Sequence, residues 1–190
     1  ISNNFLYPGI GYGGSCFPKD VKALIKTSKE YDYDFKILKS VSEVNNDQKL
    51  YLISKIKTFF NNNLKNKKVA IWGLSFKPNT DDIREAPAIE MIDSLLDLEI
   101  KVSVYDPEAI SNTKKLYGSR ISYGKNQYEI LKNTDALVIA TEWNEFKSPD
   151  FNKISSLMNE NVIFDGRNLF KIDDMKNLNF NYISIGRQNV

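Results

Sequence analysis

Apolar residues in the first third of the chain recur at spacings close to a helical turn. Between about Asp34 and Leu64 neither Pro nor Gly interrupts them, and they fall at Leu38, Val41, Val44, Leu52, Ile56, Phe59 and Phe60. The pattern predicts one long central helix, with a bend near Asn45-Asn46. A helix of ~30 residues is about 45 Å long, so we expect it to link two domains or to pack against a second copy of itself.

After Lys68 the pattern changes to short β-rich runs that alternate with helical stretches. The runs cover residues 69–72, 102–105, 136–139, 162–164 and 182–185. Helices are expected near 86–98, 108–117, 127–133 and 151–158. This alternation predicts an α/β fold: a Rossmann-like, mostly parallel sheet covered on both faces and preceded by the long central helix. The Asn-rich segment 61–63 indicates a boundary, which gives two domains, 1–66 and 67–190.

The N-terminal segment is rich in glycine and ends in a helix start. Residues 1–15 include Pro8, Gly9, Gly11, Gly13 and Gly14, a composition that predicts a loop. We expect this loop to be disordered without a partner domain, because glycine-rich backbone loses much entropy on ordering. Pro18 and Asp20 then suit the first turn of a helix, which places Cys16 at or just before its N-terminus.

Charge and composition exclude several classes of function. The 190 residues include 26 basic and 24 acidic side chains spread along the chain, so no basic stripe indicates nucleic-acid binding. No apolar run approaches the roughly 20 residues of a membrane span, and no signal peptide is visible, so we expect a cytoplasmic protein. Because Ile1 is not an initiator Met, we also expect that an upstream segment has been removed. One cysteine and no histidine exclude a disulfide framework, the usual zinc sites and Cys-His nucleophile pairs.

The lone cysteine is a candidate nucleophile. A single cysteine is most often a small buried hydrophobe. Here, however, a helix N-terminus and the neighbouring Lys19 would give Cys16 thiolate character, and the glycine loop lets backbone N–H groups approach a substrate. Asp20, one helical turn further on, could orient a water molecule or accept a proton.

Ligands of an open parallel sheet bind beyond the carboxyl ends of its strands. Lys77 and Arg167 follow two such ends and could hold a diphosphate, although they could equally be solvated surface cations. Gly73 has no further glycine at the offsets of a dinucleotide fingerprint, so we do not expect this domain to hold NAD in the usual way. Segment 80–87 can be explained as a helix start capped by Asp81 or Asp82.

Four segments resemble motifs of the UDP-glucose 6-dehydrogenases and their relatives. Residues 11–20, Gly11 to Asp20, are similar to the active-site signature of that family. Residues 73–87, 141–146 and 165–169 match further family motifs in the same order along the chain. Together the four segments are spread over nearly the whole sequence.

The resemblance implies a family fold with an N-terminal NAD-binding domain, a central dimerisation helix and a C-terminal domain for the UDP-sugar. It implies that Cys16 attacks the C6 aldehyde of the oxidised sugar, that a thiohemiacetal becomes a thioester, and that Asp20 helps water to hydrolyse it. The implied partners are UDP-glucose, NAD through the missing N-terminal domain, and a second copy of the chain. The chain by itself is expected to be inactive and at most to bind the UDP part weakly.

The resemblance also assigns binding roles. Contacts to the NAD phosphates fall on Lys19 and Arg84, which gives the charges of segment 80–87 a function beyond a helix start. Substrate-binding positions are carried over to Gly11, Gly13, Gly14, Phe76, Lys77 and Arg167. No metal is implied.

Two other functions remain open. GDP-mannose 6-dehydrogenase shares the cysteine chemistry, although segments 141–143 and 165–168 favour UDP-glucose. Dehydrogenases of UDP-N-acetyl sugars typically carry a histidine before the cysteine, where this chain has Ser15. A non-catalytic nucleotide-sugar-binding or dimerisation module, built on the long helix, belongs to a different class.

Overall fold

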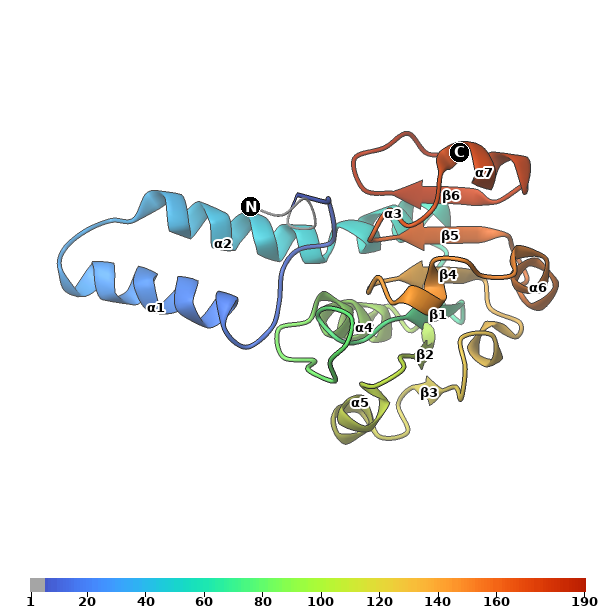
Figure 1. Ribbon diagram of the computed structural model, residues 1–190, viewed down its shortest axis with the longest axis horizontal. Coiled ribbons are helices and arrows are strands. Elements are labelled where there is room, and N and C mark those ends of the chain that lie inside the picture. Colours follow the sequence, from blue (N-terminus) through green and yellow to red (C-terminus); the bar gives the residue numbers. More distant parts are fainter. Residues whose placement is uncertain (1–5) are drawn as a thin grey trace.

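A computed structural model describes residues 6–190, which form an arm of two helices attached to a sheet domain. In the arm, α1 (Phe17–Glu30) and α2 (Lys36–Lys49) lie side by side and project from one end of the sheet (Figure 1). Cys16 is the N-cap residue of α1, and Pro18 and Asp20 lie in its first turn, so the predicted helix start is confirmed.

The single long helix predicted for residues 34–64 is wrong. The chain forms α2 and a second helix, α3 (Tyr51–Phe59), separated at Leu50, whose N–H donates to the carbonyl of Asp47 at 3.2 Å. A turn with this three-residue spacing needs neither Gly nor Pro, so the sequence carries no breaker signal there. The break separates the arm from α3, whose Leu52, Ile53 and Ile56 are buried against the sheet domain.

The sheet has six parallel strands in the order β3-β2-β1-β4-β5-β6. Their bounds are β1 Lys68–Trp72, β2 Lys101–Tyr105, β3 Ser122–Tyr123, β4 Ala136–Ile139, β5 Val162–Asp165 and β6 Asn181–Ser184. The predicted Rossmann-like parallel sheet is confirmed. The edge strand β3 was not predicted, because two residues are too short to show an alternating pattern.

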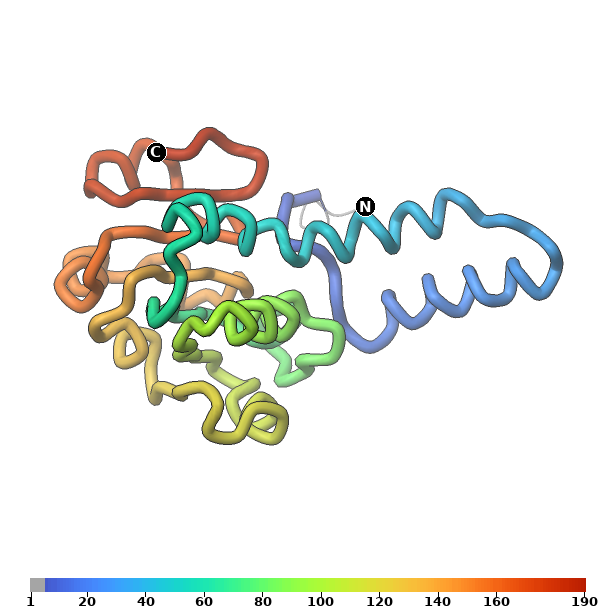
Figure 2. Tube along the Cα trace, turned by 180° about the vertical axis from the view of Figure 1, so that it is seen from behind, coloured from blue at the N-terminus to red at the C-terminus, as the bar shows by residue number. Residues whose placement is uncertain are grey.

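Helices cover both faces of the sheet (Figure 2). They are α4 (Pro87–Asp97), α5 (Ile110–Tyr117), α6 (Phe151–Leu157), α7 (Ile172–Asn177) and the short 3₁₀ turns η2 (Glu129–Leu131) and η3 (Asn144–Phe146). A helix was expected over 127–133, where the chain makes one 3₁₀ turn, and α7 was not predicted. One core includes Leu52 and Met91 from the side of α3 and α4, and the other includes Phe146 and Ile154.

Among residues 6–190, no helix is both long and apolar enough to cross a membrane. The same residues contain no group of histidine, cysteine and acidic side chains arranged to hold a metal ion.

Candidate functional site

The thiol of Cys16 is exposed at the head of α1. Its Sγ lies 3.6 Å from the hydroxyl of Ser15. The N–H of Asp20 donates to the carbonyl of Cys16 at 2.9 Å, and Lys19 Nζ lies 3.6 Å from Asp20 Oδ1. One helical turn therefore holds a thiol, an ammonium and a carboxylate, and all three are open to a substrate.

The loop before Cys16 is fastened to α2. The carbonyl of Gly9 accepts from Gln48 Nε2 at 2.7 Å, and the side chain of Asn45 bonds both the N–H of Tyr12 (2.8 Å) and its carbonyl (3.1 Å). Ile10 is fully buried in the core. Residues 6–15 thus make specific contacts in the structure, while residues 1–5 of the loop expected to be disordered lie outside the described residues.

The second half of the loop lies directly on segment 84–86. The N–H of Gly14 donates to the carbonyl of Arg84 at 2.9 Å. A Cβ on Gly13 would lie 2.2 Å from the carbonyl oxygen of Glu85, and one on Gly14, whose φ is +92°, would lie 2.8 Å from the ring of Phe76. Glycine is needed at both positions because the backbone and the ring leave no room for a side chain.

Arg84 is held by a fork of two hydrogen bonds to Asp82, with Nε 2.9 Å and Nη2 2.8 Å from the carboxylate oxygens. The hydrogen bond from Arg84 lowers the pKa of Asp82, and the same bond is the main cause that raises the pKa of Arg84. Neither Asp81 nor Asp82 caps α4, because its N-cap is Ala86 and no side chain bonds there. The explanation of this segment as a capped helix start is therefore wrong.

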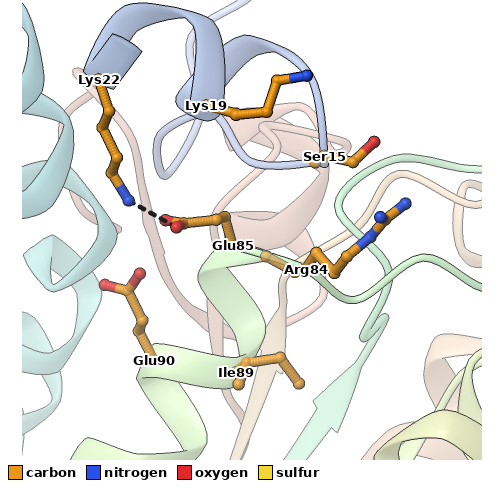
Figure 3. A pocket seen from close by; sticks show the side chains of 9 residues that line it. Ser15, Lys19, Lys22, Arg84, Glu85, Ile89 and Glu90 are labelled. Carbon is orange, nitrogen blue, oxygen red and sulfur yellow. Dashed lines mark hydrogen bonds and ion pairs between the residues drawn. The ribbon is translucent and has the colours of Figure 1, made fainter. Parts of the chain in front are cut away.

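Arg84 belongs to an open pocket of about 690 Å³ between α1 and the start of α4. Its lining includes Gly14, Ser15, Lys19, Lys22 and Glu85. Figure 3 shows that Lys22 reaches down from α1 to Glu85, whereas Lys19 and Arg84 extend toward the other side of the pocket. Two predicted cofactor contacts, Lys19 and Arg84, are thus brought together beside the loop that leads to Cys16.

A second pocket, of about 590 Å³, lies beyond the carboxyl ends of β1, β4 and β5. Lys77 and Arg167 both line it, because β1 and β5 are the two neighbours of β4. Lys147 and Arg187 add further positive charge. Arg167 Nε lies 2.5 Å from Glu142 Oε2, so an anionic ligand would have to compete with one carboxylate for the guanidinium. Its cations have the charge and the forked donors that a diphosphate requires.

The loop that carries Arg167 is shaped by Asp165, a fully buried carboxylate. It accepts from the N–H groups of Arg167 and Leu169 and from the hydroxyl of Tyr182, each at 2.8 Å. Burial raises the pKa of Asp165 and, together with the nearby carboxylate, raises that of Tyr182. These contacts fix the backbone from which Arg167 projects.

Sequence reasoning missed the role of Asp106, which closes β2. Its buried carboxylate accepts from the N–H groups of Leu74 (2.7 Å), Ala109 (2.8 Å) and Glu108 (2.9 Å) and from Trp143 Nε1 (3.1 Å). It joins the loops after β1, β2 and β4. The signal that could have found it is the Asp106-Pro107 pair directly after the strand.

The residues described here do not fit the usual cradle for NAD. A Cβ on Gly73 would lie 2.4 Å from the side chain of Thr141, whose hydroxyl donates to the carbonyl of Ser75 at 2.6 Å. Protein atoms therefore fill the place where a dinucleotide would approach the end of the first strand. Lys19 and Arg84, which line the first pocket, suit an outer contact to a phosphate of the cofactor.

Comparison with known proteins gives two family matches. Residues 70–172 match the UDP-binding domain of the UDP-glucose/GDP-mannose dehydrogenase family, and residues 1–47 match the central domain of the same family. The first match includes Lys77 and Arg167, and the second includes the loop and Cys16.

Curated relatives are similar over almost the whole chain. UDP-glucose 6-dehydrogenase TuaD of Bacillus subtilis (strain 168) is 40% identical over 187 residues, which are 98% of this chain and 40% of that protein. UDP-glucose 6-dehydrogenase of Pseudomonas aeruginosa is 41% identical over 98% of this chain and 42% of its own length. The chain spans about two fifths of the curated relatives it matches.

Solved structures share the fold. A UDP-glucose dehydrogenase from the hyperthermophilic archaeon Pyrobaculum islandicum superposes with a TM-score of 0.80 and 30% identity, over 94% of this chain and 38% of that one. GDP-mannose dehydrogenase from Pseudomonas aeruginosa gives a TM-score of 0.73 and 26% identity, over 89% and 39%.

Proposed function

The chain belongs to the UDP-glucose/GDP-mannose dehydrogenase family, and on that premise we propose that it is the C-terminal part of a UDP-glucose 6-dehydrogenase. One observation carries this proposal. The glycine loop begins beside Arg167, since a Cβ on Gly9 would lie 2.8 Å from Arg167 Nη1. It then passes over Phe76 and ends at Cys16. A single stretch of backbone thus connects the diphosphate pocket to the thiol.

In the proposed complex the UDP moiety lies in the pocket of Lys77 and Arg167. These two cations pair with the diphosphate, and the sugar extends along the glycines Gly11, Gly13 and Gly14 toward the thiol. Phe76 packs against this loop at Gly14 and closes one side of the sugar site. With the diphosphate at Lys77 and Arg167, the sugar would extend along the loop and bring its C6 carbon near Cys16.

The chemistry is a four-electron oxidation of a primary alcohol. Loss of a hydride and a proton gives the aldehyde, and the Cys16 thiolate adds to its carbon to form a thiohemiacetal. Loss of a second hydride leaves a thioester. Water, whose proton Asp20 accepts, cleaves the C–S bond, which releases the carboxylate of UDP-glucuronate and frees the thiol. NAD, when bound, supplies the acceptor for each of the two hydrides.

The described residues place limits on what this chain does alone. Lys19 and Arg84 are assigned to the NAD phosphates, but the cradle for the cofactor has to come from a domain outside them. We therefore expect the isolated chain to be inactive and to bind UDP weakly. Tight binding of NAD by the isolated chain, measured by calorimetry, would contradict this assignment.

Assembly and location follow the same proposal. Segments 1–66 and 67–190 are taken as the two domains of the chain. On the arm, Ile37, Val41 and Val44 are exposed apolar residues of α2, which suits pairing with a second copy. An exposed free thiol fits a reducing compartment, and we place the protein in the cytoplasm.

Calorimetric titration with nucleotides tests the assignment of the pocket. UDP should bind more tightly than GDP, and Lys77→Gln and Arg167→Gln should each weaken UDP binding about tenfold, since each removes a charge-assisted contact. Lys125→Gln, an exposed lysine outside this pocket, is the matched control. Tighter binding of GDP would favour the GDP-mannose dehydrogenase, and failure to bind either nucleotide would refute the pocket.

A further inference from the structure

Lys49, at the end of α2, is a buried lysine. Its side chain is 1% exposed, and its Nζ lies 2.5 Å from Glu90 Oε1 and 3.5 Å from Glu85 Oε2. An ammonium is costly to bury unless partners compensate for its lost hydration, so this arrangement persists only because the two carboxylates converge on it. Lys49 thereby ties the arm to the start of α4.

Glu85 is shared with the helix that carries the thiol. Lys22 of α1 donates to Glu85 Oε1 at 2.6 Å (Figure 3), whereas Lys49 faces the other oxygen, Oε2. The hydrogen bond from Lys22 is the main cause that lowers the pKa of Glu85, and the charges of Lys22 and Lys49 add to it. The helices α1 and α2 therefore meet at this one side chain, which lies just before the start of α4.

The backbone of Glu85 is the surface on which the glycine loop rests. Its φ is +53°, a left-handed conformation that a residue with a Cβ adopts at a cost. Its carbonyl oxygen is the atom that a Cβ on Gly13 would meet at 2.2 Å. A strained backbone of this kind needs fixed side-chain partners, and the two ammonium groups provide them.

The stem of Lys49 also touches the loop. A Cβ on Gly11, whose φ is +94°, would lie 3.1 Å from Lys49 Cγ. The same side chain thus contacts the loop with its methylene groups and holds the support of the loop with its charge. The packing of the Lys49 stem against Gly11 is independent of the ion pairs that its ammonium makes with Glu85 and Glu90.

We propose that Lys49 is a positioning residue for Cys16: its buried ammonium holds Glu85 and Glu90, fixes the strained turn under Gly13 and Gly14, and so sets the place of the thiol beside Arg84. The consequence for catalysis rests on the proposed function. The positional role does not, because it concerns contacts within this chain.

Hydrogen exchange and thiol alkylation test the positional role without turnover. Lys49→Met removes the charge and keeps most of the stem; the amides of residues 11–16 should exchange at least fivefold faster, while those of β4 and β5 stay as in the parent. Alkylation of Cys16, the single thiol of the chain, by iodoacetamide should change in rate at least threefold, because the exposed thiol no longer has its parent position in the turn. Lys49→Arg should restore most of both effects.

The controls separate position from general stability. Lys26→Met changes an exposed lysine of α1 and should leave both rates unchanged. If Lys49→Met does not fold, Glu85→Gln cuts the same link while Lys49 stays paired with Glu90, and it should loosen the same amides. Parent-like exchange at residues 11–16 in a folded Lys49→Met, or in Glu85→Gln, would overturn the proposal.

In the longer enzyme, Lys49→Met should lower kcat about tenfold and leave the KM for UDP-glucose within about twofold, as expected when the reacting group is misplaced and the binding pocket is intact. An unchanged kcat would also overturn the proposal. A parent enzyme that forms no NADH would refute the proposed function instead, and the exchange experiment would still decide the role of Lys49.

Discussion

At Gly13 the absence of a side chain decides whether the loop can lie on its support. The backbone of Glu85 comes so close that a Cβ would overlap its carbonyl carbon as well as its oxygen, at 2.8 and 2.2 Å. Gly186 is different, since its φ is +64° but nothing lies within 4 Å of its Cβ position. The two glycines are needed for different reasons, one steric and one conformational.

Gly13→Ala is therefore expected to lower the free energy of unfolding by about 2–3 kcal/mol, because the backbone must shift to admit the methyl group. Gly186→Ala should lower the free energy of unfolding by about 1 kcal/mol, because alanine is less stable than glycine in the left-handed conformation. Urea denaturation of the two variants measures the difference. Equal losses in the two variants would show that Gly13 is not in steric contact with Glu85.

Asp82 gives a pH-dependent prediction. Its folded-state pKa is lowered, chiefly by the hydrogen bond from Arg84, so its contribution to stability is complete above the unfolded value of 3.8 and is lost as the pH falls from there through the folded value. Asp82→Asn should be less stable than the parent at pH 7, and the difference should shrink below about pH 4. Asp97→Asn, on the exposed side of α4, controls for the loss of a charge. A difference that does not change with pH would contradict this role.

At the scale of elements, the loops after β1, β2 and β4 are joined at Asp106. One carboxylate oxygen of Asp106 accepts from Leu74, Ser75 and Trp143, and the other accepts from Ala109 at the start of α5. In Asp106→Asn an NH₂ group, which cannot accept these bonds, replaces one of the two oxygens. We expect a loss of about 3 kcal/mol, because buried donors are left unpaired. Asp150→Asn, at the N-cap of α6, should change stability by less than about 0.5 kcal/mol, since Asn is an equally good cap. Thermal unfolding compares the two, and similar losses would contradict the buried role of Asp106.

Periodicity in the sequence predicted most of these elements, and the exceptions have physical causes. Four of the five longer strands are buried on both faces and stand out as apolar runs, whereas β2 has half-buried residues on one face. The break at Leu50 was missed because no breaker residue marks it. Residues 127–133 form only a 3₁₀ turn, in which the carbonyl of Ile130 accepts from Ser103 of β2 and Glu129 accepts locally from the N–H of Lys125. The six-residue α7 is too short to show a helical period.

The candidate site was predictable to different depths. Lys77 and Arg167 follow strand ends, and the topology rule for parallel sheets brought them together. The roles of Lys49 and Glu85 could not be found in this way, because a buried ion pair depends on how the arm meets α4. Glu142 was likewise visible as a residue after β4, but its contact with Arg167 depends on the paths of two loops.

At the scale of the whole molecule, the arm and the sheet domain meet at the glycine loop. The loop accepts a hydrogen bond from α2, packs on segment 84–86 and contacts Arg167. These contacts fix the position of the thiol relative to the diphosphate pocket. The exposed apolar residues Ile37, Val41 and Val44 of α2 lie on the arm and line neither of the two pockets, although Tyr12 of the loop lines the same hollow.

Formation of NADH by the longer polypeptide that carries this chain tests the central claim most directly. With UDP-glucose we expect two NADH per sugar, and with Cys16→Ser a rate lower by roughly hundredfold, because the thioester cannot form. GDP-mannose should give no NADH. Full turnover by Cys16→Ser, or turnover of GDP-mannose in place of UDP-glucose, would contradict the assignment of the nucleophile or of the sugar.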